Sequence, residues 1–463
     1  MALPTWKRGL LSLAACAALY LLYGFGLDGA GVLGPDEPRY AAIGRAMADS
    51  GDWVTPRLWD KPWFEKPALL YWMTALGFKA GLSPDLAPRV PVAVASVAFL
   101  IFFFIVLRRE FGTQPAFYST AILSTSAGWL TFSHIGVTDL PLSVCFSSAM
   151  LLMIPRESEP ETSGLLKPVG AGLFLGLALL AKGLVPLVLV IPGLWFWRKR
   201  WRDMAVMMVT TVAIAVPWYG MVILRNGGPF IDEFFWKHHF ARFTNGSLQH
   251  VRPVWFFVPV LLAEMFPWTP LLLLLFRREF LKPRSVQFLL AWVVFGLGFF
   301  SLSENKLPGY ILPLLPAIAA LMGTRFAKVN RSPWLLGISA ASLWCIPLVA
   351  EVLPAALLKG ASNVQPSLPA SLVVGGVLTA MVVAWICWKG DNARGVGLIT
   401  AGVIAGVTFL MLTAFPALDE NVSARGFWRR NGNVSCVESG TRAWLYGLNY
   451  YAKREVPDCD PEP

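Results

Sequence analysis

Long apolar runs recur along most of this chain, and they constrain its fold more than any other feature. Each run is comparable to the roughly 20 residues that a helix needs to cross the hydrocarbon of a bilayer. The runs are too long, and too little interrupted by alternating polar residues, to be strands of a membrane barrel. The composition agrees, because 56% of the residues are hydrophobic and only 14% are charged, whereas about a quarter is charged in a typical soluble domain. The sequence therefore predicts an all-α polytopic membrane protein.

The apolar runs predict about 13 transmembrane spans. The first run, residues 9–27, follows two basic residues as a signal peptide does, but no clear small-residue cleavage site follows it, so we interpret it as a retained helix. Two later runs, 168–181 and 183–197, are short for a full crossing, and we interpret one or both as tilted or re-entrant. The remaining runs lie near residues 86–107, 115–132, 140–154, 204–224, 254–276, 286–302, 309–324, 333–353, 368–388 and 395–415.

Basic residues predict the orientation of these spans. Clusters near residues 7–8, 108–109, 198–202, 277–284 and 325–331 fall on one side of the predicted bundle, which is cytoplasmic by the positive-inside rule. An odd number of spans then divides the chain into a transmembrane domain, residues 1–415, and a small external tail or domain, residues 416–463.

The external tail contains two cysteines, Cys436 and Cys459. An oxidising compartment would allow them to pair, and a small external unit gains stability from such a cross-link. Two free thiols are the alternative.

The net charge of +11 mostly reflects this orientation and does not indicate affinity for nucleic acid. Further basic residues nevertheless lie in the predicted outer segments, where the rule does not require them. They favour an anionic ligand at the outer membrane surface, with anchoring to lipid headgroups as the alternative. These residues are Arg57, Lys66, Arg225, Lys237, Arg242 and Lys306.

Two outer segments, residues 28–82 and 225–252, are longer than simple connections require. In the first we expect amphipathic helices near 37–49 and 68–82 that lie on the membrane; Tyr40, Ile43 and Met47 recur there at helical spacing. The second segment has the same aromatic and basic character. We expect the two segments to cover one site together.

The first outer segment begins with two adjacent carboxylates, Asp36 and Glu37, followed by Arg39. A structural interpretation is available, because Asp36 can cap a helix that has Pro38 in its first turn. A functional interpretation is favoured by Asp139, which follows the third predicted span on the same outer side. Ionisable residues at span boundaries are usually functional or paired.

Other polar residues accompany these carboxylates. Glu65 and Lys66 precede the second amphipathic piece, where a solvated pair without a role is the alternative. Lys306 and Tyr310 lie at a short outer turn. Lys182, between two short apolar runs, either extends to the membrane surface or meets an anion.

Several motifs together resemble those of the GT-C membrane glycosyltransferases, above all the bacterial lipid A aminoarabinose transferases and their protein O-mannosyltransferase relatives. The motifs occur in the family's order across about residues 10–320, and they are specific in combination although weak singly. They are Gly34-Pro-Asp-Glu-Pro-Arg-Tyr40, Trp53-Val-Thr-Pro-Arg57, Phe64-Glu-Lys-Pro67, Leu70-Tyr-Trp72, Pro217-Trp-Tyr219, His239-Phe-Ala-Arg-Phe243 and Lys306-Leu-Pro-Gly-Tyr-Ile-Leu-Pro313.

The resemblance implies a GT-C-type helix bundle in the inner (plasma) membrane that moves a sugar from a polyprenyl phosphate, with inversion, on the periplasmic side. The acceptor it implies is lipid A, another envelope glycan or a protein. Negative charge develops on the leaving phosphate, so cations and hydrogen-bond donors are needed there. We assign this donor-binding role to Arg39, Lys66, Arg242, Lys306 and Tyr310.

The acceptor oxygen needs a base on the opposite face of the sugar. The resemblance gives that role to Asp36 and a second, auxiliary acidic position to Asp139. If the acceptor is itself a phosphate, little base is needed and Asp36 mainly orients it. We expect Glu37 and Arg57 to shape the loop or contact the acceptor.

This chemistry requires no cofactor. Glu65 and His239 match positions near which some relatives hold a divalent ion, so Zn²⁺ is one option. Plain hydrogen bonding is the other, because His238 stands where relatives often have an acid.

A transporter or flippase of a lipid-linked substrate is the rival function. It predicts charges near mid-membrane and a repeated half-architecture, whereas the unusual charges here gather on one outer face. The expected partners are therefore the polyprenyl-phosphate-linked donor, its acceptor and membrane lipids, and not nucleic acid.

Overall fold

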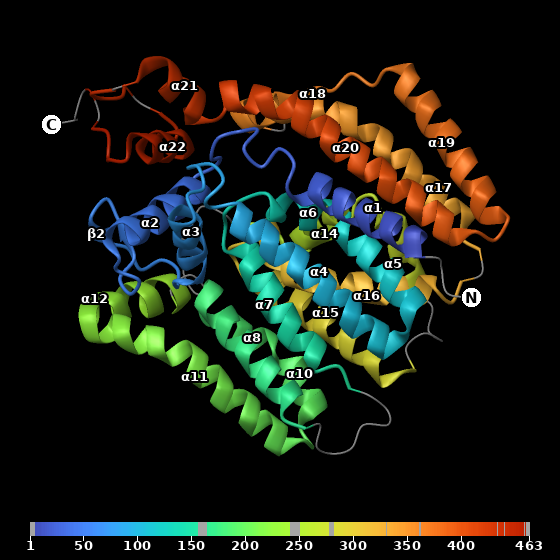
Figure 1. The fold of residues 1–463 in the computed structure, drawn as a ribbon, viewed down its shortest axis with the longest axis horizontal. Helices are drawn as coiled ribbons and strands as arrows, with labels where there is room; N and C mark the ends of the chain where they lie inside the picture. The colour runs from blue at the N-terminus through green and yellow to red at the C-terminus, as the bar shows by residue number, and fades with distance from the viewer. Residues whose placement is uncertain are drawn as a thin grey trace.

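The structure, a computed structural model, describes residues 5–155, 164–240, 251–276, 282–329, 331–360, 363–432, 434–438, 440–457 and 459. Within these residues the chain is a bundle of helices (Figure 1). The one sheet of the described residues is a small antiparallel hairpin, in which β1 (Arg57–Leu58) pairs with β2 (Lys61–Pro62). The described residues are thus mostly helical, as the sequence predicted.

Seven helices among the described residues are long and apolar enough to cross a membrane by length and composition. The chain is thus a multi-pass membrane protein. The seven are α4 (Val90–Phe111), α11 (Trp201–Asn226), α15 (Arg284–Leu302), η5 with α16 (Pro308–Leu314 and Leu315–Phe326), α17 to α18 through η6 (Pro333–Ser342, Leu343–Cys345 and Ile346–Lys359), α19 (Ala370–Trp388) and α20 (Asn392–Asn421).

The predicted span 254–276 is bent in the structure. It consists of η2 (Val254–Phe256), α14 (Phe257–Glu264) and η3 (Thr269–Phe276), and its two halves meet at 117°. Pro267 and Pro270 lie at the bend, where each lacks the N–H that would continue a helical hydrogen-bond ladder. Counted as one span, this pair raises the number of candidate crossings to eight.

Other predicted spans are shorter or divided. Lys182 ends α8, and Gly183 follows with a φ of +78°, which glycine adopts without strain. The run 115–132 also divides into two helices around the polar pair Thr125 and Ser126. The helices concerned are α1 (Thr5–Tyr23), α5 (Thr113–Ser124), α6 (Ala127–Ser133), α7 (Asp139–Leu152), α8 (Leu166–Lys182), α9 (Val185–Leu189) and α10 (Ile191–Trp197).

The two outer segments meet at one end of the bundle. Figure 1 shows α2 (Asp36–Ser50), α3 (Leu69–Lys79) and α12 (Gly228–Phe230) together at this end, and η1 (Ile231–Phe240) continues α12. A cluster of buried apolar side chains joins the segments, with Val54 and Phe64 from the first packed near Trp218, Phe230 and Phe234. The expectation that both segments lie together therefore agrees with their packing.

Helix α2 does not lie on a membrane surface with one free face. Tyr40, Ile43 and Met47 are buried, and the helix packs against α3 on one side and α22 (Arg442–Ala452) on another. The predicted helical spacing is correct, but the partner of the apolar face is protein.

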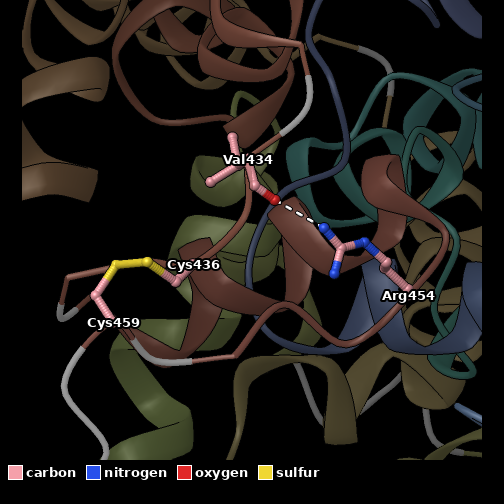
Figure 2. Close-up of a disulfide and its surroundings, with 4 residues drawn as sticks. All are labelled: Val434, Cys436, Arg454 and Cys459. Atoms are coloured by element: carbon pink, nitrogen blue, oxygen red, sulfur yellow. Dashed lines mark hydrogen bonds between the residues drawn. A yellow bond between two sulfur atoms is a disulfide. The ribbon is translucent and has the colours of Figure 1, made fainter.

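The C-terminal unit follows α20, which ends at Asn421, and contains α21 (Ala424–Asn431) and α22. Its own apolar cluster is small, and a disulfide between Cys436 and Cys459 closes the segment after α21 (Figure 2). Arg454 donates a hydrogen bond to the carbonyl of Val434 at 2.8 Å beside it.

Buried charges attach this unit to the bundle. Arg425 donates to Asp419 at 2.6 Å and to Asp85 at 2.8 Å, and Tyr451 donates to the other oxygen of Asp85 at 2.6 Å. Because Asp85 precedes α4 and Asp419 lies in the last turn of α20, the tail is fixed to two membrane-spanning helices.

Candidate active site

Arg39 is the centre of the first group of polar side chains. Its Nη1 donates to Glu65 Oε2 at 2.9 Å, its Nη2 to Asp36 Oδ1, and its Nε to the carbonyl of Pro35 at 2.9 Å. Burial opposes charge on this guanidinium, but Glu65 and the neighbouring acidic groups outweigh it and raise the pKa of Arg39. Arg39 is buried, whereas 43% of the Asp36 side chain is exposed. A fixed, permanently charged group thus holds a carboxylate that solvent can reach.

Asp36 is the first residue of α2 and not its N-cap. Pro35 occupies the cap position, and that cap makes no side-chain hydrogen bond. The structural alternative considered for Asp36 is therefore wrong, because its carboxylate turns to Arg39.

Three aromatic rings surround the guanidinium of Arg39. Its Cζ lies 5.7 Å from the ring centre of Tyr40, 5.6 Å from that of Trp63 and 5.2 Å from that of Tyr446. Tyr446 comes from α22, more than 400 residues along the chain. Sequence reasoning did not find this residue, because no motif links the C-terminal unit to the first outer segment.

Glu65 lies between two cations. Besides Arg39, Lys66 places its Nζ 3.4 Å from Glu65 Oε1, and both side chains are largely buried. Among the described residues no group of three or more His, Cys, Asp or Glu is arranged to hold a metal ion, and Arg39 and Lys66 already pair with Glu65. The side chain of His239 lies outside the described residues.

Glu37 is turned away from this group and is 1% exposed. Arg89 binds it through two nitrogens, Nε to Oε1 at 2.7 Å and Nη2 to Oε2 at 2.8 Å. The same guanidinium donates to the carbonyls of Leu27, Ala30 and Gly31. The pair therefore fixes the path of the chain from α1 into α2.

Glu37 also connects the two outer acidic positions. Its Oε1 accepts a hydrogen bond from the backbone N–H of Gly136 at 2.9 Å, three residues before Asp139. The segment that carries Asp139 is therefore held against the start of α2, which carries Asp36.

Asp139 forms a second group with Lys182 and Tyr310. Lys182 Nζ lies 2.6 Å from Asp139 Oδ1 and 4.9 Å from the ring centre of Tyr310. Of the two alternatives for Lys182, the structure has it meet an anion. This cation stands beside two predicted site residues.

Lys306 lies at the outer turn near Tyr310. Its Nζ donates to the carbonyl of Arg252 at 3.0 Å and to that of Ser303, and it is buried. A β-bridge between Val251 and Asn305 joins the same two segments. Lys306 thus fastens the end of the second outer segment to this turn.

Two other predicted residues are placed differently. Arg57 lies on the hairpin, where its Nη1 donates to the carbonyl of Asp60 at 3.2 Å, and it lines a polar groove of about 500 Å³ with Arg45 and Lys453. This groove is separate from the Arg39 group. Arg242 lies outside the described residues.

Comparison with known proteins identifies related chains. Residues 65–219 match the model of the dolichyl-phosphate-mannose-protein mannosyltransferase family. An undecaprenyl phosphate-alpha-4-amino-4-deoxy-L-arabinose arabinosyl transferase of Pseudomonas paraeruginosa is 30% identical over 98% of this chain and 89% of its own length. The protein of the same name from Pseudomonas aeruginosa is 32% identical over 69% of this chain, and the match spans 59% of that relative's length.

Solved structures share the fold. The crystal structure of ArnT from Cupriavidus metallidurans bound to undecaprenyl phosphate matches with a TM-score of 0.77 and 24% identity, over 97% of this chain and 85% of that one. The apo structure of the same protein matches with a TM-score of 0.76, over 98% of this chain. The described helices are therefore arranged as in that fold.

Proposed function

Because this chain belongs to the family of the undecaprenyl phosphate-alpha-4-amino-4-deoxy-L-arabinose arabinosyl transferases, we propose that it moves 4-amino-4-deoxyarabinose from undecaprenyl phosphate to lipid A. The Arg39 group carries the proposal, since a partly exposed Asp36 is held there by a buried cation next to Lys66. A phosphate leaving group and a nucleophile need this combination of charges.

In the proposed reaction an oxygen of the acceptor attacks the anomeric carbon of the sugar. The bond from that carbon to the phosphate oxygen breaks, and undecaprenyl phosphate leaves with the electron pair. Asp36 takes the proton when the acceptor is protonated and otherwise orients it. Arg39 binds Asp36 Oδ1, so we assign the other oxygen, Oδ2, to the acceptor.

The cations stabilise the departing phosphate. Lys66 brings an ammonium group from the segment before α3, Lys182 brings one from the end of α8, and Tyr310 brings a phenol beside Lys182. We also assign Arg242 and Lys306 to the phosphate. Fixed donors of this kind stabilise developing charge without reorganising during the reaction. Asp139 keeps Lys182 oriented.

We further propose that the site faces the periplasm in an inner-membrane protein of about 13 spans. Helix α4 supports this orientation, because Arg108 and Arg109 lie in its last turn, at the end opposite the site. In the same proposal, residues 416–463 form an external unit that covers the first outer segment. Labelling of introduced cysteines in intact and permeabilised cells tests the orientation.

Mass spectrometry of envelope glycolipids and glycoproteins from cells with and without the chain tests the function. We expect a mass increment of one aminoarabinose on lipid A that disappears with Asp36→Asn and returns with the wild-type chain. Full restoration by Asp36→Asn would contradict the role of Asp36. If cells without the chain fail to move the lipid-linked sugar across the membrane, while transfer of the sugar to lipid A stays intact in opened vesicles, the chain is a flippase instead.

A further inference from the structure

Glu264 is a buried carboxylate that the proposed reaction does not use. It ends α14, just before the bend, and is only 6% exposed. In the part of the chain that the structure describes, neither of its oxygens has a hydrogen-bond partner. Buried carboxylates are almost always paired or hydrogen-bonded, because leaving water without compensation is costly. The unmet oxygens of Glu264 therefore indicate a missing partner.

The neighbours of Glu264 leave an excess of negative charge. Asp139 is close enough to interact with it electrostatically. Lys182 neutralises Asp139 at 2.6 Å, so the group contains two carboxylates and one ammonium. A second positive group would balance the charges.

Two glycines pack closely against the two carboxylates. A Cβ added at Gly128 would lie 2.6 Å from the Cβ of Glu264, and one added at Gly309 would lie 2.5 Å from Asp139 Oδ1. Contacts this short do not occur between real atoms, so α6 and η5 approach the carboxylates as only glycine allows. Their positions are thus fixed before any ligand binds, which is typical of preorganised recognition.

We propose that Glu264, with Asp139 beside it, binds the ammonium group of the donor sugar and selects an amino sugar over a neutral one. This inference rests on the proposed function, in which the donor carries a 4-amino-4-deoxyarabinose. An ammonium has three N–H donors and a positive charge, which match the unused oxygens and the excess charge. A neutral sugar with a hydroxyl at that position offers one O–H donor and no positive charge, and buried polar groups left unpaired give strong discrimination.

Two undecaprenyl-phosphate-linked donors test the proposal, one with 4-amino-4-deoxyarabinose and one with arabinose, which has a hydroxyl in place of the amine. The purified full chain in detergent is assayed with lipid A, and kcat/KM is measured for each donor. We expect the wild-type chain to prefer the amino donor by about 10- to 100-fold, the ratio expected for one hydrogen bond to a charged group.

Glu264→Gln keeps the shape of the side chain and removes its charge. We expect it to lose this preference by slowing the amino donor while leaving the arabinose donor unchanged. Asp203→Asn is the matched control. Asp203 is also buried, but it lies in the first turn of α11 and pairs with Arg200. We expect it to retain the wild-type preference.

The outcomes separate this inference from the proposed function. A wild-type chain that uses neither donor contradicts the proposed function. A wild-type chain that uses both equally contradicts only the amine site, and this measurement does not depend on whether the variant folds. Full activity of Glu264→Gln on the amino donor would also overturn the site, because Glu264 would then be a neutral buried acid. An equal loss of kcat/KM on both donors in Glu264→Gln overturns the site as well, since the role of Glu264 would then be structural.

Discussion

The buried pair of Glu37 and Arg89 should contribute more to stability than an exposed ion pair in the same protein. Glu37 is 1% exposed and Arg89 is 2% exposed, and the two form two hydrogen bonds of 2.7 and 2.8 Å. Removal of one partner of a buried pair leaves the other charge uncompensated, which costs about 3–5 kcal/mol. We therefore expect Glu37→Gln to lower the free energy of unfolding by about 3 kcal/mol, the lower end, because the amide can still accept one hydrogen bond.

A double-mutant cycle with Arg89→Met isolates the pairwise part of this energy. Arg89→Met alone also leaves three backbone carbonyls without their hydrogen-bond donor, and the cycle subtracts that separate loss. The matched control is Asp52 with Arg225, which lie 3.0 Å apart with 25% and 57% of their side chains exposed. Exposed pairs of this kind contribute about 0.2–1 kcal/mol.

Unfolding of the detergent-solubilised chain by denaturant measures both cycles. We expect a coupling energy of about 2 kcal/mol or more for Glu37 and Arg89, and below about 1 kcal/mol for Asp52 and Arg225. Similarly small coupling energies for the two pairs would refute the expectation that burial makes the Glu37–Arg89 pair the stronger one. Glu37→Gln should also slow transfer, because Glu37 positions both Asp36 and the segment that carries Asp139.

Three further changes have defined outcomes. Tyr446→Ala should reduce kcat/KM by about 2- to 30-fold, since the ring face contacts Arg39 and such a contact is worth about 0.5–2 kcal/mol. Tyr446→Phe keeps the ring and should not reduce it. Equal loss in both variants would assign the effect to the hydroxyl. Reduction of the Cys436–Cys459 disulfide should destabilise the C-terminal unit by about 3 kcal/mol. An unchanged melting temperature of the reduced protein would contradict this. Burial lowers the pKa of His134, so the unfolded chain takes up its proton first and stability should fall as the pH drops from about 7 to 5. Comparison of thermal melts for wild type and His134→Phe over that range tests the assignment, since the variant should lose less stability on acidification.

The helix positions were predictable because apolar run length is a local property. Helix α2, expected at 37–49, spans Asp36–Ser50, and α20, expected at 395–415, spans Asn392–Asn421. The bend between α14 and η3 was missed because hydropathy does not register the effect of proline on backbone hydrogen bonds.

The site was partly predictable because its motif residues lie close together in sequence. Asp36, Arg39 and Glu65 with Lys66 form one group in the structure, as two neighbouring motifs suggested. Arg89 was missed, although it had a signal: a basic residue at the outer end of a span is unexpected under the positive-inside rule. Tyr446 had no such signal, because only tertiary packing brings α22 to α2.

The C-terminal unit belongs to the site and not merely to the surface around it. Tyr446 covers Arg39, and Arg39 holds Asp36, so the carboxylate assigned to the acceptor depends on the docking of α22. That docking depends on Arg425, whose charge is satisfied by Asp85 and by Asp419 at the end of α20. The site is therefore incomplete until the last membrane helix and the tail have folded against the first outer segment, even though every residue assigned to the donor phosphate precedes residue 311 in the sequence.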